Sequence, residues 1–432
     1  MLSKKVLIIT YYWPPAGGPG VQRWLKFAQY LPEFGVEPII YTPENPSYPQ
    51  IDKSLLNEIP PGLKIVKTKI WEPYQIAEKL NPKSREYKAG HFEKSQNQSF
   101  LTKLSVFIRG NFFIPDARKF WIKPSVKFLK KYLAENQIQT IITTGPPHSL
   151  HLIGLKLKSE NPDLKWLADF RDPWTQISYH SELKLTKNAQ KKHKKLEKEV
   201  LENADSVIAA SFTDAGNYKK SGAEKVEIIT NGFEESDFLL QGVACGTQSG
   251  KFKITYSGGL EIARNPENLW RALNKLKTEH PEFAKDLELE FVGNLSREVQ
   301  NNLASFNLIG NLNNTGYLSH KETINKIMNS DLLLLTNFPD EKSKGIIPGK
   351  LFEYLATGNP VLAIGPGGGD VEKILEKTNA GKYFTHTDIE ALKEFVFGLY
   401  SKWKTGGIQS RPSSVIFDFT RKSLAKQLAE II

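Results

Sequence analysis

Short runs of apolar and β-branched residues alternate with longer segments of helical period along almost the whole chain. In the first half, such runs predict strands at residues 6–10, 37–42, 63–68, 140–144, 164–170, 206–211 and 226–230. Residues 21–31, between the first two runs, place Val21, Leu25 and Ala28 on one face of a helix. This alternation is typical of parallel strands that are joined by crossover helices.

The same alternation restarts in the second half, after a stretch of small residues at 239–250 that we interpret as a linker. Four further strands are predicted at residues 252–257, 287–292, 332–336 and 360–364. Helices are predicted at residues 266–279, 320–329, 349–357 and 389–402. The pattern therefore predicts an α/β protein with two doubly wound, Rossmann-like domains.

We place the first domain at residues 1–240 and the second at 251–405. The remaining segment, 406–432, contains a break followed by a helix at 420–432, which we expect to cross back to the first domain. Ligands bind at the carboxyl ends of the strands in open parallel sheets, so we expect a site in a cleft between the two domains.

Composition narrows the setting of this fold. The chain has 432 residues and one cysteine, Cys245, which excludes an internal disulfide and favours a reducing, cytoplasmic location. The apolar run at residues 6–9 is too short for a secretion signal, and no run approaches the roughly 20 apolar residues of a spanning helix. Residues 1–130 hold 20 Lys and Arg against 10 Asp and Glu, which points to an anionic partner.

A glycine-rich turn, residues 13–20, separates the first predicted strand from the first helix. Gly17, Gly18 and Gly20 would let the backbone approach an acceptor or a phosphate at the start of that helix; a plain tight turn is the alternative. The turn lacks the spaced Gly-x-Gly-x-x-Gly pattern, and residues 38–43, where an acidic residue is expected, contain none. A nicotinamide or flavin cofactor is therefore not expected.

Two other strand-end loops of the first domain carry polar residues. Asp169, Arg171 and Asp172 follow a buried strand, where a catalytic or acceptor-binding group would project. Asp172 would orient the acceptor hydroxyl or accept its proton, and Arg171 would pair with Asp172 or bind the acceptor. His148, in the loop after residue 144, competes for the same role. A structural Asp–Arg pair and a histidine bonded to backbone are the alternatives.

In the second domain, Ser257-Gly258-Gly259 ends a strand and Arg264-Asn265-Pro266 opens the next helix. Residues 345–361 then form a glycine-rich loop, a short helix with a glutamate, and a strand, and they include the pattern Pro-x-Lys-x-Phe-Glu-Tyr-x-Ala-x-Gly-x-Pro-Val. With these motifs the chain resembles the retaining family 4 glycosyltransferases of GT-B fold, over both domains and in a bacterial branch of that family.

The resemblance implies a donor site in the second domain. Arg264 and Lys350 match the basic residues that hold the donor diphosphate, beside Gly258, Gly259 and Gly349. Glu353 matches the glutamate that binds the ribose hydroxyls. The family's first glutamate would fall at Gly345 and its usual arginine at Gly259, so this chain departs from the family at both positions.

Backbone N–H groups of Gly367 and Gly368 are further candidates for contacts to phosphate or sugar, with a flexible loop as the alternative. No two aspartates are two residues apart, so the D-x-D metal motif of the other major glycosyltransferase architecture is missing. We therefore expect a metal-independent reaction and no cofactor besides the nucleotide-sugar substrate.

Residues 100–131 combine seven aromatic with eight basic side chains, which suits an anionic membrane surface and a lipid-linked acceptor; a core-packing helix pair with a solvated basic face is the alternative. Residues 184–198 are a second basic stretch, which we interpret as a solvated helix face or a further membrane contact. Neither matches a nucleic-acid-binding motif, so we expect no nucleic-acid partner.

These patterns together predict a glycosyltransferase that transfers a sugar from a nucleotide-diphosphate sugar to a hydroxyl acceptor, which is a sugar or a lipid-linked molecule. We expect it to act in cell-surface polysaccharide or glycolipid synthesis, in the cytoplasm or peripherally on the inner membrane face. Two alternatives stay open: a nucleotide-sugar epimerase of the same fold, and a non-catalytic scaffold that binds nucleotide sugars.

Overall fold

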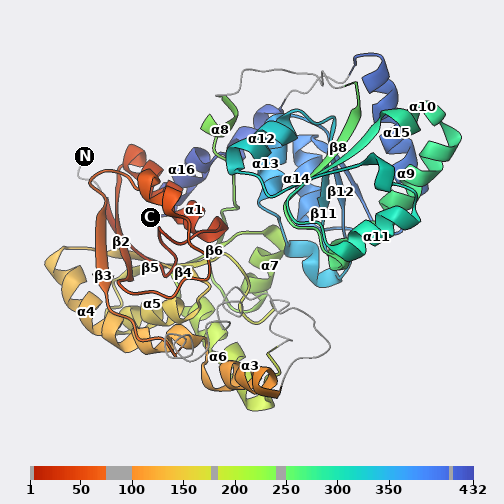
Figure 1. Ribbon diagram of the computed structural model, residues 1–432. Helices are drawn as coiled ribbons and strands as arrows, with labels where there is room; N and C mark the ends of the chain where they lie inside the picture. Colours follow the sequence, from red (N-terminus) through yellow and green to blue (C-terminus); the bar gives the residue numbers. More distant parts are fainter. Residues whose placement is uncertain (1–3, 74–99, 177–182, 240–249, 408–411) are drawn as a thin grey trace. The chain divides into compact units, whose positions relative to one another are not determined.

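The computed structural model describes residues 4–73, 100–176, 183–239, 250–407 and 412–432. The chain divides into two compact units, Met1–Thr230 with Lys422–Ile432, and Asn231–Arg421. We call them the first and the second unit (Figure 1). Most of the expected linker at 239–250, and Cys245 within it, lies outside the described residues. Within the described residues, no helix combines the length and apolarity needed to cross a membrane.

The first unit is built on a seven-stranded parallel sheet in the order β3-β2-β1-β4-β5-β6-β7. Its strands are β1 (Lys4–Ile9), β2 (Val36–Pro43), β3 (Lys64–Thr68), β4 (Thr140–Gly145), β5 (Lys165–Phe170), β6 (Ser206–Ala209) and β7 (Val226–Ile228). Its helices are α1 (Pro19–Tyr30), α3 (Phe100–Phe112), α4 (Ile122–Glu135), α5 (Ser149–Glu160), α6 (Lys187–Asn203), α7 (Phe212–Lys220) and α16 (Arg421–Ile431). The strand order reverses direction at β1, as in a doubly wound fold.

Both faces of this sheet are buried, because successive side chains of a strand point to opposite sides. Leu7 and Ile9 of β1 belong to one core with residues of α4, α5 and α6. Val6 and Ile8 belong to a second core with residues of α1 and α16. The C-terminal helix α16 therefore packs on the first sheet, although about 190 residues of the other unit precede it.

The second unit contains a six-stranded parallel sheet in the order β10-β9-β8-β11-β12-β13. Its strands are β8 (Phe252–Ser257), β9 (Leu287–Val292), β10 (Leu312–Gly316), β11 (Leu332–Thr336), β12 (Val361–Ile364) and β13 (Gly381–Phe384). Its helices are α8 (Ser236–Leu239), α9 (Glu267–Glu279), α10 (Pro281–Asp286), α11 (Arg297–Ser305), α12 (His320–Met328), α13 (Lys350–Thr357), α14 (Asp370–Thr378) and α15 (Glu390–Lys404). One core cluster joins this sheet to α9, α10, α11 and α15.

The unit boundaries follow a pairing between two distant segments. The backbone N–H of Phe233 donates to Phe419 O at 3.1 Å, and the N–H of Arg421 donates to Phe233 O at 2.9 Å. The chain therefore enters the second unit directly after β7 and leaves it directly before α16. Sequence reasoning placed these points at residues 240 and 405, because it could not anticipate a bridge between positions far apart in the chain.

The predicted α/β class with two doubly wound sheets is confirmed, and all eleven predicted strands occur. Strands β10 and β13 were missed, as were α10, α11 and α14. Both missed strands are sheet edges with half-polar sequences, Leu-Asn-Asn-Thr-Gly and Gly-Lys-Tyr-Phe. An edge strand pairs on one side only and needs no continuous apolar run, so its sequence gives a weak signal.

Candidate functional site

Two cations lie close together at the carboxyl end of β8, a central strand of the second sheet. Lys350 is the first residue of α13; its Nζ donates a hydrogen bond to Ser257 O and lies 3.6 Å from the centroid of the Tyr256 ring. Arg264 lies in a short turn before α9, and its Nη2 donates to Gly259 O at 2.8 Å. The structure thus brings together two residues that are 86 positions apart in the sequence.

The two cations have no carboxylate in direct contact, although the negative charge of Glu353 acts on Lys350 from a distance. Within the described residues, neither Lys350 nor Arg264 makes an ion pair. Withdrawal from water lowers the pKa of Lys350, and the nearby charge of Arg264 acts in the same direction. Burial tends to raise the pKa of Tyr256, but the charges of Lys350 and Arg264 outweigh it and the pKa is lowered. A bound anion would relieve the repulsion between the two cations.

The loop beneath these cations depends on two glycines. Gly258 has φ +96° and Gly293, after β9, has φ +129°, a region that L-residues rarely adopt. A Cβ on Gly293 would lie 2.6 Å from Gly258 O, whereas a Cβ on Gly259 would have Asn294 O at 3.9 Å as its nearest neighbour. Sequence reasoning missed Gly293. Its signal was a glycine placed directly after the predicted strand 287–292.

Glu353, three residues after Lys350 on α13, is the acidic group of this region. Its side chain is 26% exposed, and its Oε1 lies 4.0 Å from His320 Nδ1. His320 Nε2 lies 3.1 Å from Asp237 Oδ2. Burial raises the pKa of Glu353, and the hydrogen bond to Asp237 raises the pKa of His320. His320 and Asp237 were not predicted, because only the tertiary fold brings α8, α12 and α13 together.

The other predicted donor-site glycines differ in the space around them and in whether their N–H groups already have a partner. Gly349 caps α13 and is exposed, and no atom lies within 4 Å of the position of its missing Cβ. Gly367 and Gly368 lie in the loop between β12 and α14. The N–H of Gly368 already donates to Glu372 Oε2 at 2.6 Å. A phosphate would therefore have to compete with Glu372 for this amide.

In the first unit, the glycine-rich turn contacts the loop after β5. Gly18 caps α1 with φ +106°, and Gly17 N donates to Gln50 O at 3.1 Å. Arg171 lies so close to the start of α1 that a Cβ on Gly20 would be 1.4 Å from its Nη1. Arg171 Nη2 also donates to Pro146 O. Two predicted groups, the turn and Arg171, therefore lie side by side at the carboxyl edge of this sheet.

Asp169 is fully buried and its carboxylate is occupied. It accepts hydrogen bonds from Trp24 Nε1 at 3.0 Å and Thr144 Oγ1 at 2.8 Å, and it pairs with Arg23 Nη2 at 3.2 Å. Arg23 is also buried and donates to the backbone of Thr230 and to that of Ile229. This position anchors the turn and the loop, and a direct contact of Asp169 with a ligand would require the network to open.

The candidates for acid–base chemistry differ in access. His148 is buried, with its ring stacked on Trp174 at a centroid distance of 4.8 Å. The nearby His151, which was not predicted, is stacked on Phe170 and has its pKa lowered to about 3 by burial and by the charge of Arg171. Asp172 is the most exposed residue of the predicted catalytic set, although the packing around its carboxyl group raises the pKa of that group.

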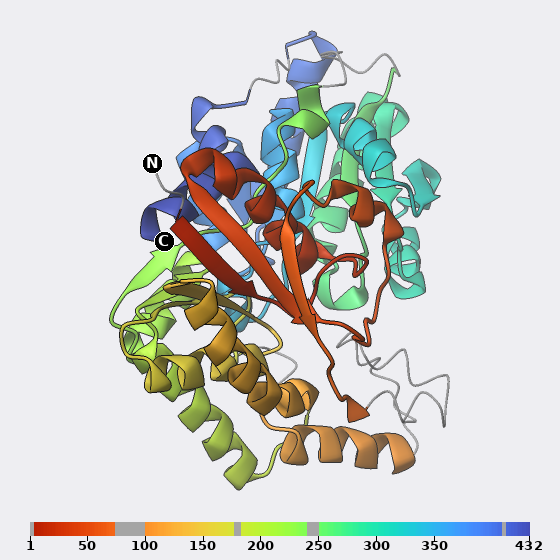
Figure 2. The ribbon, with the colours of Figure 1, turned by 90° about the vertical axis from the view of Figure 1, so that its left-hand side faces the viewer.

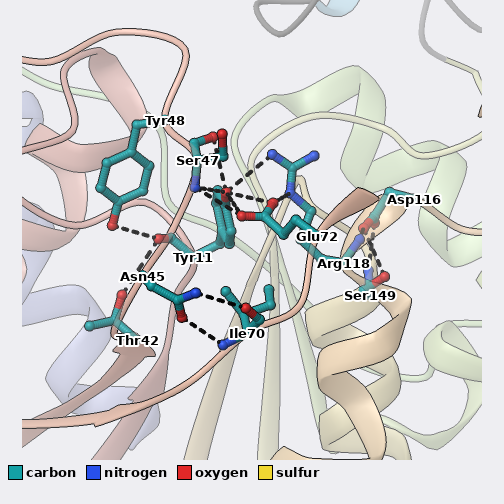
Figure 3. A network of polar contacts seen from close by, with 10 residues as sticks. All are labelled: Tyr11, Thr42, Asn45, Ser47, Tyr48, Ile70, Glu72, Asp116, Arg118 and Ser149. Atoms are coloured by element: carbon teal, nitrogen blue, oxygen red, sulfur yellow. Dashed lines mark hydrogen bonds and ion pairs between the residues drawn. The ribbon is translucent and has the colours of Figure 1, made fainter. Parts of the chain in front are cut away.

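A buried polar network supports the same edge of the first sheet (Figure 3). Glu72 accepts from Tyr11 Oη at 2.8 Å and from Ser47 N at 2.9 Å, and it pairs with Arg118 Nε at 3.1 Å. Tyr11, Ser47 and Glu72 follow β1, β2 and β3, so the network ties three strand-end loops together. Nearby, Asp116 accepts from Ser149 N at 2.9 Å. Sequence reasoning did not identify this network.

Within the described residues, no three His, Cys, Asp or Glu side chains gather in a way that could hold a metal ion. The polar groups at the two sheet edges are thus of two kinds. The first edge carries buried ion pairs, and the second carries partly buried cations beside a glutamate. The second arrangement suits a ligand with an anionic group and neighbouring hydroxyls.

Comparison with known proteins identifies this architecture. No family model and no curated protein sequence matches the chain. Among solved structures, a sucrose-phosphate synthase from Thermosynechococcus elongatus aligns over 99% of this chain and 98% of its own, with a TM-score of 0.61 and 15% identity. The fold is that of the GT-B glycosyltransferases.

Two further GT-B structures cover the chain equally well. A glycosyltransferase from Rickettsia africae aligns over 99% of this chain and 97% of its own, with a TM-score of 0.62 and 16% identity. HepE from Anabaena, in complex with UDP-glucose, aligns over 99% and 98%, with a TM-score of 0.58 and 13% identity. At such low identity these likenesses establish the GT-B fold, and the chemistry has to be argued from the residues of this chain.

Proposed function

We propose that this protein is a glycosyltransferase that transfers a sugar from a nucleotide-diphosphate sugar to a hydroxyl acceptor. The observation that carries the proposal is the convergence of Lys350 and Arg264 at the end of β8, where neither has a carboxylate partner within the described residues. A diphosphate supplies the anion that this pair lacks. Glu353, one helical turn from Lys350, supplies an acceptor for the ribose hydroxyls.

The proposed reaction needs little more from the donor site than fixed charge. As the bond between the sugar and the diphosphate breaks, negative charge develops on the leaving diphosphate. Lys350 and Arg264 are held in place by backbone carbonyls, so their charges stabilise the leaving group without reorganisation at the moment of reaction. In this proposal the two side chains fill the role that a divalent cation has in other transferases, and the reaction is metal-independent.

On the acceptor side, we assign the orienting role to Asp172. Its carboxylate is suited to accept a hydrogen bond from an acceptor hydroxyl. The neighbouring Arg171, whose guanidinium lies against the first turn of α1, is suited to an anionic part of the acceptor. A sugar or a lipid-linked acceptor, a role in polysaccharide or glycolipid synthesis, and retention of the anomeric configuration belong to the same proposal. They rest on the resemblance carried by residues 345–361.

The test is a calorimetric titration with uridine, guanosine and adenosine diphosphates and their sugars, in EDTA and then with added Mg²⁺. We expect saturable binding of one base in EDTA, and a loss of about 10- to 100-fold in Arg264→Ala, the range for one charged hydrogen bond to phosphate. Lys402→Ala, an exposed lysine on α15, is the matched control. Absence of binding to the whole panel would refute the donor site.

Turnover separates the remaining alternatives. The nucleotide sugar that binds is incubated with acceptor mixtures, and the products are separated by mass and by sugar stereochemistry. Transfer to a hydroxyl supports the proposal. Release of an epimerised free sugar or nucleotide sugar in the absence of acceptor would identify an epimerase, and tight binding without any turnover would identify a scaffold.

A further inference from the structure

Helix α3 in the first unit turns apolar side chains outward. Leu104, Phe107, Ile108 and Phe112 recur at helical spacing along one stripe, and all are exposed, Phe112 by 64%. The opposite side packs inward: Val106 is buried, and a Cβ on Gly110 would meet Leu185 at 2.7 Å. A surface helix normally buries its apolar side chains, so the outward apolar stripe of α3 is an exception. The sequence-based alternative, core-packing helices with a solvated basic face, describes α4, where Val126 and Leu129 are buried, but it does not describe this stripe of α3.

The apolar stripe continues onto neighbouring segments. Trp71, after β3, is 51% exposed, and its ring meets the exposed Phe120 edge-to-face with centroids 4.6 Å apart. Lys119 lies among the rings: its Nζ donates to Phe112 O at 2.6 Å and lies 5.1 Å from the centroid of Phe120. Apolar rings and a cation are thus interleaved over this part of the surface.

Helix α6 adds the second basic stretch to the same surface. Asn111, at the end of α3, accepts from Thr186 N at 2.7 Å and donates to Lys184 O at 3.4 Å, which fixes the start of α6 beside α3 (Figures 1 and 2). Partial burial lowers the pKa of Lys119, and the charge of Lys192 on α6 lowers it further. Two basic stretches that are separated by about 50 residues in the sequence, 100–131 and 184–198, therefore contribute to one electrostatic surface.

We call this region the α3–α6 surface. It comprises Trp71, Leu104, Phe107, Ile108, Phe112, Lys119, Phe120, Lys184 and Lys192. Between residues 100 and 131 there is a single acidic residue, Asp116, and its carboxylate is taken up by hydrogen bonds from Ser149 and the backbone of Arg118. That segment therefore supplies one carboxylate against eight basic side chains, and this carboxylate is bound to Ser149 and the backbone instead of a lysine of the surface.

We propose that the α3–α6 surface docks on an anionic lipid bilayer. A bilayer offers the two things that this surface lacks, a hydrocarbon layer for the outward stripe and a plane of negative charge for the surrounding lysines. The lysine stems bury their methylene groups while the ammonium groups stay at headgroup level. The inference goes beyond the proposed transferase activity and does not depend on the donor site, since every residue involved belongs to the first unit.

The test uses the tryptophan that the surface itself contains. Trp13, Trp24, Trp121, Trp166, Trp174 and Trp270 are fully buried and Trp403 is partly buried, which leaves Trp71 as the exposed reporter. The full-length protein is mixed with vesicles of phosphatidylcholine alone or of phosphatidylcholine mixed with anionic phosphatidylglycerol. We expect the protein to bind anionic vesicles, with a blue shift of Trp71 emission and quenching of that emission by brominated acyl chains. The variant Trp71→Phe should still bind but should show neither the blue shift nor the quenching.

Two sets of variants separate the apolar from the electrostatic contribution. Replacing Lys119, Lys184 and Lys192 by Gln is expected to weaken binding by about 100-fold, from roughly a factor of five for each lysine near the membrane surface. Phe107→Ser with Phe112→Ser is expected to remove the quenching and to weaken binding at least about tenfold. Matched controls are Lys219, Lys220 and Lys402 changed to Gln, and Ile309 and Phe417 changed to Ser, all exposed residues elsewhere.

Thermal unfolding verifies that each variant is folded before it is used. The proposal is overturned by equal binding to neutral and anionic vesicles, by binding that leaves Trp71 emission unchanged, or by controls that lose as much affinity as the surface variants. Capture of a soluble acidic protein or polyanion with no vesicle binding would also overturn it and would assign the surface to that partner. Raising the salt concentration from 0.01 to 0.15 M shortens the Debye length about fourfold, so binding that weakens over this range supports the proposal.

Discussion

The two sheet edges of this protein treat charge in opposite ways. At the edge of the first sheet, Asp169 is paired with Arg23 and Glu72 is paired with Arg118, and all four residues are buried. At the edge of the second sheet, Lys350 and Arg264 make hydrogen bonds to backbone carbonyls and have no acidic partner within the described residues. The same kind of fold thus provides one edge with balanced charges and another with an unbalanced one.

This difference distinguishes charges that stabilise the protein's loops from charges that are available to bind a ligand. A buried charge whose partner is supplied by the protein fixes the loops that carry the pair, but it has nothing left for a ligand. A cation without a partner is costly until an anion arrives, and that cost turns into affinity for the anion. The following experiments test this contrast, beginning with the largest expected effect.

The largest effect is expected for Asp169→Ala. The substitution leaves Arg23 buried without its carboxylate and should lower the free energy of unfolding by about 3–5 kcal/mol. The matched control is Asp172→Ala, because Asp172 follows the same strand but is exposed, and its removal should change stability by less than about 0.5 kcal/mol. Urea denaturation of both variants measures the contrast. A similar loss in both would show that Asp169 is no anchor.

Next comes Lys350→Gln, which removes one of the two cations at the second edge. We expect the affinity for the nucleoside diphosphate to fall by about 100-fold, equivalent to roughly 3 kcal/mol. The free energy of unfolding should fall by no more than about 1.5 kcal/mol, because the substitution removes a hydrogen bond to Ser257 O but breaks no ion pair. Lys321→Gln, an exposed lysine on α12, is the control. Calorimetry and thermal unfolding are measured together, and a variant that loses stability but keeps its affinity would contradict the assignment.

A smaller effect is expected for the glycines of the donor loop. Gly293→Ala should lower stability by roughly 1–3 kcal/mol, because the position has φ +129° and the new Cβ would meet Gly258 O. Gly259→Ala should be nearly neutral, because its Cβ has room. Denaturation curves of the two variants decide the point, and equal costs would mean that the close approach of Gly258 and Gly293 is unimportant.

The smallest effect concerns the pH dependence of the second unit. The pKa of His320 is raised by Asp237, so the protonated ring stabilises the fold below its unfolded pKa of about 6.5, and this contribution is lost as the pH rises through the folded pKa. NMR titration of the His320 ring should give a pKa above about 6.5, and Asp237→Asn should lower it. An unchanged titration in Asp237→Asn would remove Asp237 as the cause.

Most of the fold was predictable from the chain alone. Every strand with a continuous apolar run was found, because a strand buried on both faces needs apolar side chains at successive positions, as in residues 6–9 and 332–335. Edge strands such as β10 escaped, because they are half solvated and carry polar residues. The return of α16 to the first sheet was expected from the chain break before it and is seen in the packing of Leu424 and Leu428.

For the candidate site, the sequence identified residue types at strand ends but could not tell which of them are accessible. Lys350, Glu353 and Arg264 were found by their motifs, and their roles stay predictions until the titrations are done. Asp169 and His148 carried the same signal as Asp172, yet the fold buries both and leaves Asp172 exposed. The sequence shows that a residue lies at the end of a strand, but the exposure of its side chain depends on which other residues pack against it.

What the sequence by itself determined is therefore the class of fold, the order of its main strands and the loops in which chemistry can occur, since these depend on local periodicity. Only the tertiary structure decided which charges are neutralised, as Glu72 is by Arg118, and which stay open, as Lys350 does. It also decided that α3 and α6 form one surface. Pairing and burial depend on contacts between residues far apart in the chain, and no local pattern records them.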